Sequence, residues 1–264
     1  MINPDSEQYS DIQTEICGGN VLLITLNRPE FRNALRNHTL FEITRALEFA
    51  TASEAIRAVV VYGGLKFFAA GADINEMALL TAVTAVTDVR PEYWKKIASF
   101  SKPLLAAVNG YALGAGCELT MHADIVIAGE SARFGQPEIN LGTIPGAGGT
   151  QRLIRTVGKS LAMKMVLSGE LIQAPVALAC GLVAELTPDE QTLERSLALA
   201  AAIAGKSPLA VRLAKEAMLL SFEIPLSAGL NSERKSFSLL AASQDRAEGI
   251  AAFYAKRVAA FTGK

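Results

Sequence analysis

The stretch SKPLLAAVNGYALGAGCEL, Ser101–Leu119, combines an apolar run, a glycine-rich turn and the start of a helix. Within and after it, Leu104–Val108 predicts a strand, Gly114–His122 a helix and Asp124–Ala128 another strand. Strands that alternate with helices in this way favour an α/β fold with at least partly parallel pairing.

The same alternation extends toward the N-terminus. Two strand-like runs, Asp11–Cys17 and Val21–Asn27, flank Gly18-Gly19-Asn20, and this pattern predicts a hairpin. Apolar residues with helical spacing then predict a helix over His38–Ala52. The β-branched run Arg57–Tyr62 predicts a buried strand.

The C-terminal part has a different composition. From about Ser160 the chain is rich in alanine and leucine with helical spacing. Three helical segments stand out there: Thr192–Ala204, Pro208–Ser221 and Asp245–Val258. We therefore predict two parts, an α/β core over residues 1–190 and a helical region over residues 191–264.

Composition excludes several classes of protein. The chain has 264 residues, of which 50% are hydrophobic, so it has enough apolar surface to bury a sizeable core and is not intrinsically disordered. Its 25 basic residues against 26 acidic ones leave a net charge of −1, which argues against a dedicated nucleic-acid binder. No apolar run reaches membrane-spanning length, so we expect no membrane partner.

The cysteines and the N-terminal residues bear on compartment and metal binding. Cys17, Cys117 and Cys180 lack metal-ligand spacing, so we expect no metal site. An odd cysteine count suits a reducing compartment. The acidic first residues resemble neither a secretory signal nor a transit peptide, and we therefore expect a cytoplasmic location.

The two histidines are poor candidates for catalysis. His38 falls at the start of a predicted helix, where a surface or capping role is simpler. His122 falls late in a predicted helix, where a positive charge would favour the helix dipole. A Ser–His–Asp mechanism therefore has little support, and neither a Walker sequence nor a dinucleotide fingerprint occurs.

Glycine recurs just after three predicted strands, in Phe67–Ile74, Asn109–Leu119 and Phe134–Leu153. Small residues let backbone N–H groups approach a ligand closely, and at a helix start those groups are also unpaired. Two such donors converging on one oxygen make an oxyanion hole. Spacing alone leaves a second interpretation open, in which these glycines serve turns and packing.

Two carboxylates accompany the glycines. Glu118 comes one helical turn after Gly114-Ala115, and Glu138 follows Pro137 in a segment that favours extended backbone. Two carboxylates beside backbone donors suit proton transfer next to a polarised carbonyl. On the residues alone, two ordinary solvated glutamates remain the simpler interpretation.

These segments, together with LNRP at Leu26–Pro29 and NAL at Asn33–Leu35, resemble the crotonase family of acyl-CoA enzymes, most closely the enoyl-CoA hydratases. The resemblance runs from about Val21 to FYAKR at Phe253–Arg257. It implies an α/β superhelix of repeated ββα units with a helical C-terminal trimerisation region. The expected assembly is a homotrimer or a dimer of trimers.

The resemblance also assigns roles by position. It places the oxyanion-hole amides at Ala72 and Ala115, where many members have glycine at the second position, and the catalytic carboxylates at Glu118 and Glu138. The remaining positions are those expected to bind the substrate around its thioester and those expected, more weakly, to meet the CoA moiety. The first set is Ala72, Asp73, Ile74, Asn75, Ala115 and Gly146, with Gly146 setting the attacking water, and the second is Arg28, Phe253 and Lys256.

The implied activity is that of a hydro-lyase, the reversible syn addition of water to a trans-2-enoyl-CoA. It needs no metal or cofactor, because CoA enters as part of the substrate. Two alternatives stay open: a Δ3,Δ2-enoyl-CoA isomerase, and an RNA-binding member of the family. A pI near 6.2 and the lack of a basic run speak against RNA binding.

Two pathways stay open. Asp88–Lys96 and Val108–Leu119 are similar to the bacterial hydratases of phenylacetate breakdown, which act on 2,3-dehydroadipyl-CoA. The short-chain hydratases of fatty-acid β-oxidation are nearly as similar, notably over Phe134–Pro145. A dicarboxylate substrate would need a cation at the acyl end of the pocket, and the sequence does not place one.

Overall fold

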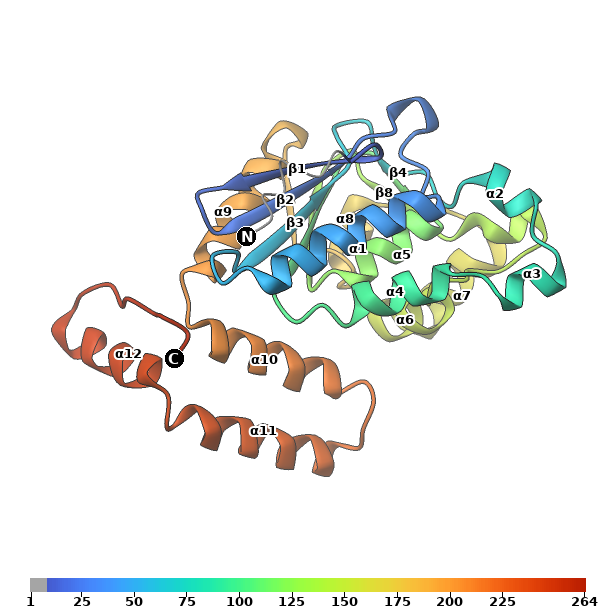
Figure 1. Cartoon of the computed structure of the whole chain (residues 1–264). Coiled ribbons are helices and arrows are strands. Elements are labelled where there is room, and N and C mark those ends of the chain that lie inside the picture. The colour runs from blue at the N-terminus through green and yellow to red at the C-terminus, as the bar shows by residue number, and fades with distance from the viewer. Residues whose placement is uncertain (1–8) are drawn as a thin grey trace.

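The fold of residues 9–264 is seen in a computed structural model (Figure 1). Its strands are β1 (Ile12–Cys17), β2 (Val21–Leu26), β3 (Ala58–Tyr62), β4 (Phe67–Ala69), β5 (Leu104–Val108), β6 (Tyr111–Leu113), β7 (Ile125–Gly129), β8 (Arg133–Gly135), β9 (Ile172–Gln173) and β10 (Glu185–Thr187). Its helices are α1 (Asn37–Ala52), α2 (Ile74–Ala78), α3 (Ala82–Val86), α4 (Arg90–Ala98), α5 (Ala115–His122), α6 (Gly149–Val157), α7 (Lys159–Ser168), α8 (Ala174–Ala179), α9 (Thr192–Ala204), α10 (Pro208–Leu220), α11 (Leu226–Leu240) and α12 (Gln244–Ala255). Three short 3-10 helices are η2 (Pro29–Phe31), η3 (Pro137–Leu141) and η4 (Asp189–Gln191).

The larger sheet has the strand order β1-β2-β3-β5-β7-β10. β1 and β2 form the predicted hairpin, in which Cys17 pairs with Val21. Gly18 and Gly19 at its turn have φ of 59° and 80°, a left-handed conformation that favours glycine. The remaining neighbours pair in parallel, as the alternation of strands and helices predicted.

The smaller sheet is built from the short strands that follow directly on the larger one. Its order is β4-β6-β8-β9, and β4, β6 and β8 run parallel. β4 leads into α2, β6 into α5 and β8 into η3, so a strand of each sheet is followed by a helix three times in succession. The predicted α/β class and its repeated ββα units are confirmed.

Both faces of the larger sheet are covered, which explains its apolar strands. Along β3, Val59 and Val61 face the main core, whereas Ala58 and Val60 face a second cluster on the opposite side. α9 closes that second cluster with Ala200 and Ala204. A strand buried on both faces reads as a continuous apolar run, as AVVVY does here.

The C-terminal helices divide into two groups. α9 packs on β3, β5 and β7, while α10, α11 and α12 form an arm that extends away from the α/β body (Figure 1). The predicted division after residue 190 precedes the helix that covers the sheet, and it stays a prediction.

Sequence patterns missed one long helix and the second sheet. In α11, with the sequence LSAGLNSERKSFSLL, many polar residues separate the apolar ones, so its helical spacing is hard to recognise. The strands of the second sheet span only two or three residues each, too few for a periodic signal.

No helix among residues 9–264 is by itself long and apolar enough to cross a membrane. The segments 189–204 and 208–220, bent at 109° to each other, meet that criterion only when taken together.

Candidate active site

The start of α5 is pressed against the end of β4. A Cβ on Gly116 would lie 2.2 Å from the carbonyl oxygen of Ala69, so only glycine permits this approach. Gly114, which precedes the helix, has φ of 48°, and a Cβ there would lie 3.7 Å from the Cα of Gly71. The two glycine-bearing segments predicted from the sequence therefore meet.

This contact brings together Ala72 and Ala115, the residues that follow Gly71 and Gly114. Ala115 is the first residue of α5, so its N–H has no partner within the helix. Ala72 forms a parallel bridge with Leu35, but the bonds of that bridge use the amides of Leu35 and Asp73. Neither Ala72 nor Ala115 donates its N–H to an acceptor within residues 9–264. Two unpaired donors thus lie on adjoining segments, as an oxyanion hole requires.

The LNRP and NAL segments hold the Ala72 loop in place. Leu35 N donates to Gly71 O at 2.8 Å, and Asp73 N donates to Leu35 O at 3.0 Å. The Asn33 amide donates to three carbonyls of the preceding loop, those of Gly63, Phe67 and Phe68. These bonds fix the backbone on both sides of the Ala72 amide.

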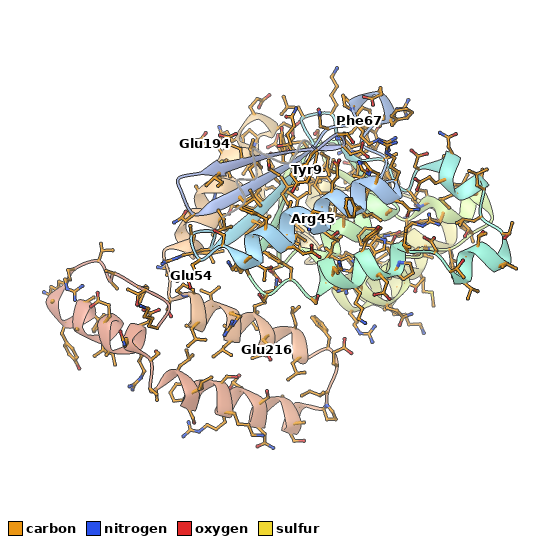
Figure 2. The ribbon with its side chains drawn as sticks, in the orientation of Figure 1. Tyr9, Arg45, Glu54, Phe67, Glu194 and Glu216 are labelled. Carbon is orange, nitrogen blue, oxygen red and sulfur yellow. The ribbon has the colours of Figure 1, made fainter. Side chains whose placement is uncertain are left out.

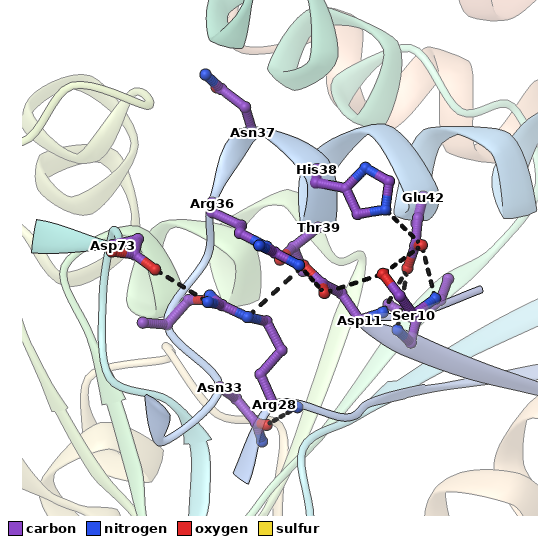
Figure 3. A network of polar contacts seen from close by, with 12 residues as sticks. Ser10, Asp11, Arg28, Asn33, Arg36, Asn37, His38, Thr39, Glu42 and Asp73 are labelled. Atoms are coloured by element: carbon purple, nitrogen blue, oxygen red, sulfur yellow. Dashed lines mark hydrogen bonds and ion pairs between the residues drawn. The ribbon is translucent and has the colours of Figure 1, made fainter. Parts of the chain in front are cut away.

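Arg28 also holds the Ala72 loop, through a contact with Asp73 (Figure 3). Its Nη2 donates to Asp73 Oδ2 at 3.1 Å, and both side chains are buried. Asp73 is the N-cap of α2, and its other oxygen accepts from Asn75 N at 3.0 Å. The placement favours a positioning role for Arg28 over the predicted contact with CoA, because its guanidinium is already committed.

Glu118 is held by two backbone amides. Its carboxylate is 2% exposed, and Oε1 accepts from Ala147 N and Gly149 N, each at 2.7 Å. Burial raises the pKa of Glu118, while these two hydrogen bonds and the charge of Arg152 oppose that rise. The amides of Ala147 and Gly149 come from the GAGG run, Gly146–Gly149, where the sequence analysis had singled out only Gly146.

Glu138 lies above the start of α5. A Cβ on Gly114 would be 3.0 Å from Glu138 Oε1, which places this carboxylate beside the Ala115 amide. Its segment forms the 3-10 turn η3 rather than the extended loop that was expected, with Pro137 at the first position. Burial raises the pKa of Glu138 to about 7, and the negative charge of Glu118 adds to this.

Gln136 lies between the two carboxylates, and the sequence analysis missed it. Oriented with its nitrogen toward Glu138, its fully buried amide donates to Oε1 at 2.9 Å and to Oε2 at 3.2 Å. A Cβ on Gly149 would lie 2.8 Å from Glu118 Oε1 and 3.1 Å from Gln136 Cδ, so Gln136 also borders Glu118. The two carboxylates therefore share one site next to the two unpaired amides.

His122 differs from its expectation. Burial and the charge of Arg152 lower its pKa to about 4, so the ring is neutral near pH 7. The prediction that its charge favours the helix dipole is therefore wrong. His38 lies at the start of α1, half exposed, and contacts Glu42 at 2.9 Å, as a surface role predicts.

The other predicted binding residues divide into those next to the site and those in the helical arm. Ile74 is 62% exposed at the start of α2, near Asn75, and Gly146 is exposed at the start of the GAGG run. Phe253 and Lys256 lie near the end of α12, in the arm and apart from the carboxylates (Figure 1). Within residues 9–264, no group of three or more His, Cys, Asp or Glu side chains is arranged to hold a metal ion.

Comparison with known proteins finds relatives described as hydratases of CoA thioesters or as members of that family. Residues 17–264 match the family described as enoyl-CoA hydratase/isomerase. The chain is 56% identical to the 2,3-dehydroadipyl-CoA hydratase of Escherichia coli K12, over 92% of this chain and 96% of that protein. It is 48% identical to the mitochondrial enoyl-CoA hydratase of Pongo abelii, over 90% of this chain and 82% of that one. A crystal structure of an enoyl-CoA hydratase from Bacillus anthracis superposes with a TM-score of 0.92 at 35% identity, covering 97% of this chain and 100% of the other.

The crowding around Glu118 predicts the effect of a single methyl group. We expect Gly149→Ala to lower the free energy of unfolding by about 1–3 kcal/mol, because its Cβ would meet Glu118, Pro145 and Gln136. Gly146→Ala is the matched control, since nothing lies within 4 Å of its Cβ. Urea unfolding measures both variants, and equal stabilities would contradict the proposed crowding.

The raised pKa of Glu138 predicts a pH-dependent stability. Its side chain ionises near pH 7 in the folded chain but near 4.5 when freely solvated. Between these values the folded state binds more protons than the unfolded state, so this group's contribution to stability falls as pH rises. Glu138→Gln removes the effect, and we expect it to gain stability relative to the parent between pH 5 and pH 8, by roughly 1 kcal/mol or more. Parallel stability curves for the two proteins would contradict the raised pKa.

Proposed function

We propose that this chain, which belongs to the enoyl-CoA hydratase/isomerase family, is an enoyl-CoA hydratase that adds water reversibly to a trans-2-enoyl-CoA. Enzymes of this family act on acyl-CoA thioesters. The observation that carries the proposal is the pair of carboxylates, buried Glu118 and half-buried Glu138, beside the unpaired amides of Ala72 and Ala115. CoA enters with the substrate, and the reaction needs no further cofactor or metal.

The two amides polarise the substrate. The thioester oxygen accepts hydrogen bonds from the N–H groups of Ala72 and Ala115, which draws electron density away from C3 of the conjugated acyl group. Charge develops on this oxygen as water attacks, so the bonds strengthen in the transition state, and each is worth about 3 kcal/mol. Asp73, Ile74 and Asn75 follow directly and line the thioester.

The two carboxylates divide the proton transfers. Glu118 accepts a proton from the water that attacks C3, while the amides of Ala147 and Gly149 hold its carboxylate in place. Glu138, whose pKa of about 7 keeps much of it protonated, delivers a proton to C2. The backbone at Gly146 borders the water. The hydroxyl group adds to C3 and the proton to C2 on the same face of the double bond, which gives syn addition.

The printed names of the relatives favour hydration over isomerisation. The relatives from Escherichia coli and Pongo abelii are both called hydratases, and two carboxylates suit water addition. No observation favours RNA binding in a chain whose basic and acidic residues nearly balance. We retain the cytoplasm as the proposed location.

Hydration is tested by following the loss of the conjugated enoyl-thioester absorbance with crotonyl-CoA. We expect Glu118→Gln and Glu138→Gln each to lower kcat by about two to four orders of magnitude, because each removes one proton-transfer group. The control is Glu130→Gln, which alters an exposed carboxylate outside the site. A near-normal rate in either site variant would remove that residue from the mechanism, and isomerisation of a 3-enoyl-CoA without water uptake would replace the proposed reaction.

The helical arm supports a homotrimer or a dimer of trimers. Neither α10 nor α11 buries a residue in the isolated chain, and their side chains stand out from the helices (Figure 2). Leu226 and Phe237 are 77% and 62% exposed, which is costly for large apolar groups in water. We infer that other subunits cover them, and that Phe253 and Lys256 meet CoA phosphate or adenine groups bound by a neighbouring subunit.

Assembly is tested by measuring mass in solution with light scattering. We expect the parent chain to be a multiple of three subunits, and Phe237→Glu to shift it to monomer because a buried charge at an apolar interface is unfavourable. Lys235→Glu is the control for charge, on an exposed position of the same helix. A monomeric parent chain would overturn the proposed assembly.

A further inference from the structure

His122 is a half-buried polar side chain that the proposed mechanism does not use. It is the last residue of α5, one helical turn beyond Glu118. Its ring stacks on Trp94 of α4, with centroids 5.2 Å apart and planes at 20°. Its Nε2 lies 3.1 Å from the carbonyl oxygen of Ala147, the residue whose amide holds Glu118.

One ring nitrogen of His122 is left without a partner. A carbonyl only accepts, so Nε2 carries the proton that binds Ala147, and Nδ1 is then an acceptor. Nδ1 is closed to solvent and has no hydrogen-bond partner within residues 9–264. An unused polar atom in a buried position costs free energy unless a ligand satisfies it.

The positions along α5 match the order of atoms in an acyl chain. Ala115, Glu118 and His122 follow the spacing i, i+3, i+7, which places them on one face of the helix. Ala115 is proposed to hold the thioester oxygen at C1, and Glu118 to act at C3. His122 lies about 6 Å further along the helix, at the rise of 1.5 Å per residue. An acyl group extended along this face brings its sixth carbon toward His122.

We propose that His122 recognises a carboxyl group at the far end of the acyl chain, so that the preferred substrate is a dicarboxylic enoyl-CoA of six carbons. This inference rests on the proposed hydratase function, and it makes His122 a specificity-determining residue. The 2,3-dehydroadipyl-CoA hydratase of Escherichia coli, 56% identical, is named for a substrate of this class.

The charges around His122 suit such a ligand. The Arg152 guanidinium, half-buried, acts on both His122 and Glu118, and no carboxylate of residues 9–264 lies within ion-pair distance of it. A carboxylate that reaches Nδ1 needs a donor there, so the ring takes up a proton from water as the ligand binds. Nδ1–H then donates to the carboxylate while Nε2–H stays on Ala147. The resulting imidazolium and the ligand carboxylate neutralise each other.

The test compares two substrates of equal length in the full-length protein. The ratio of kcat/KM for 2,3-dehydroadipyl-CoA to that for trans-2-hexenoyl-CoA isolates the terminal carboxylate. We expect His122→Leu to lower this ratio about tenfold or more, because it removes a buried hydrogen bond to a charged group. His122→Gln keeps a donor for Ala147 but nothing at Nδ1, and we expect the same loss. His122→Asn places an amide near the position of Nδ1, and we expect it to retain part of the ratio. His38→Gln, at the other histidine of the chain, is the control.

Proton uptake gives a second readout that a structural role would not move. Calorimetry with adipyl-CoA and hexanoyl-CoA, in buffers of different ionisation heat, should show uptake only with adipyl-CoA, and none in His122→Asn. An unchanged ratio in His122→Leu, or an equal fall for both substrates, would overturn the inference. A parent chain that hydrates hexenoyl-CoA but not dehydroadipyl-CoA would overturn it while leaving the hydratase proposal standing. Hydration of neither substrate would overturn both.

Discussion

The carboxylate of Glu118, buried and held by the amides of Ala147 and Gly149, is the interaction around which the site is organised. A buried carboxylate is unfavourable unless hydrogen bonds to its charged form offset the lost hydration. Those bonds join α5 to the segment that begins α6. Gly149 can approach Glu118 only because it lacks a side chain. The conformation of the GAGG run is therefore set by its two hydrogen bonds to Glu118 Oε1. His122 contacts the same segment through the Ala147 carbonyl.

A second constraint acts on the other side of the site, where a chain of buried charges fixes the Ala72 loop (Figure 3). Glu42 accepts from the amides of Asp11 and Ile12, and Asp11 pairs with Arg36 and also lies near Arg28. Burial opposes ionisation of Asp11, but its hydrogen bonds with Arg36 and Thr39 prevail and lower its pKa to about 2. Buried ion pairs add little net stability, yet they fix geometry, because a displaced partner leaves an unpaired buried charge. Arg28 connects this group of charges to the Ala72 loop, because it donates to Asp73, the residue after Ala72.

The sequence predicted long, periodic elements well and local geometry poorly. α9 was predicted at its observed bounds, Thr192–Ala204, because its apolar face packs on a sheet. The second sheet was missed, because a strand such as Arg133–Gly135 is held by pairing with distant strands, which no local pattern encodes. At the site, resemblance to a family supplied the residue types, but not the orientation of Gln136 or the amides that hold Glu118. Those depend on a close backbone approach that appears only when segments far apart in sequence meet. The enclosed position of His122 Nδ1 was missed for the same reason, since Trp94, on which the ring stacks, lies 28 positions earlier.

The two carboxylates have different surroundings, and this difference suits the proposed division into an acid and a base. Burial raises the pKa of Glu118, but the two backbone amides and the charge of Arg152 oppose that rise. Glu138 has the Gln136 amide as its polar neighbour and the negative charge of Glu118 nearby, so its protonated form persists to about pH 7. Two further amide donors at Glu138 would oppose the rise of its pKa in the same way. The different surroundings of the two carboxylates therefore depend on which of them the GAGG backbone reaches, and the packing of α6 against α5 determines this.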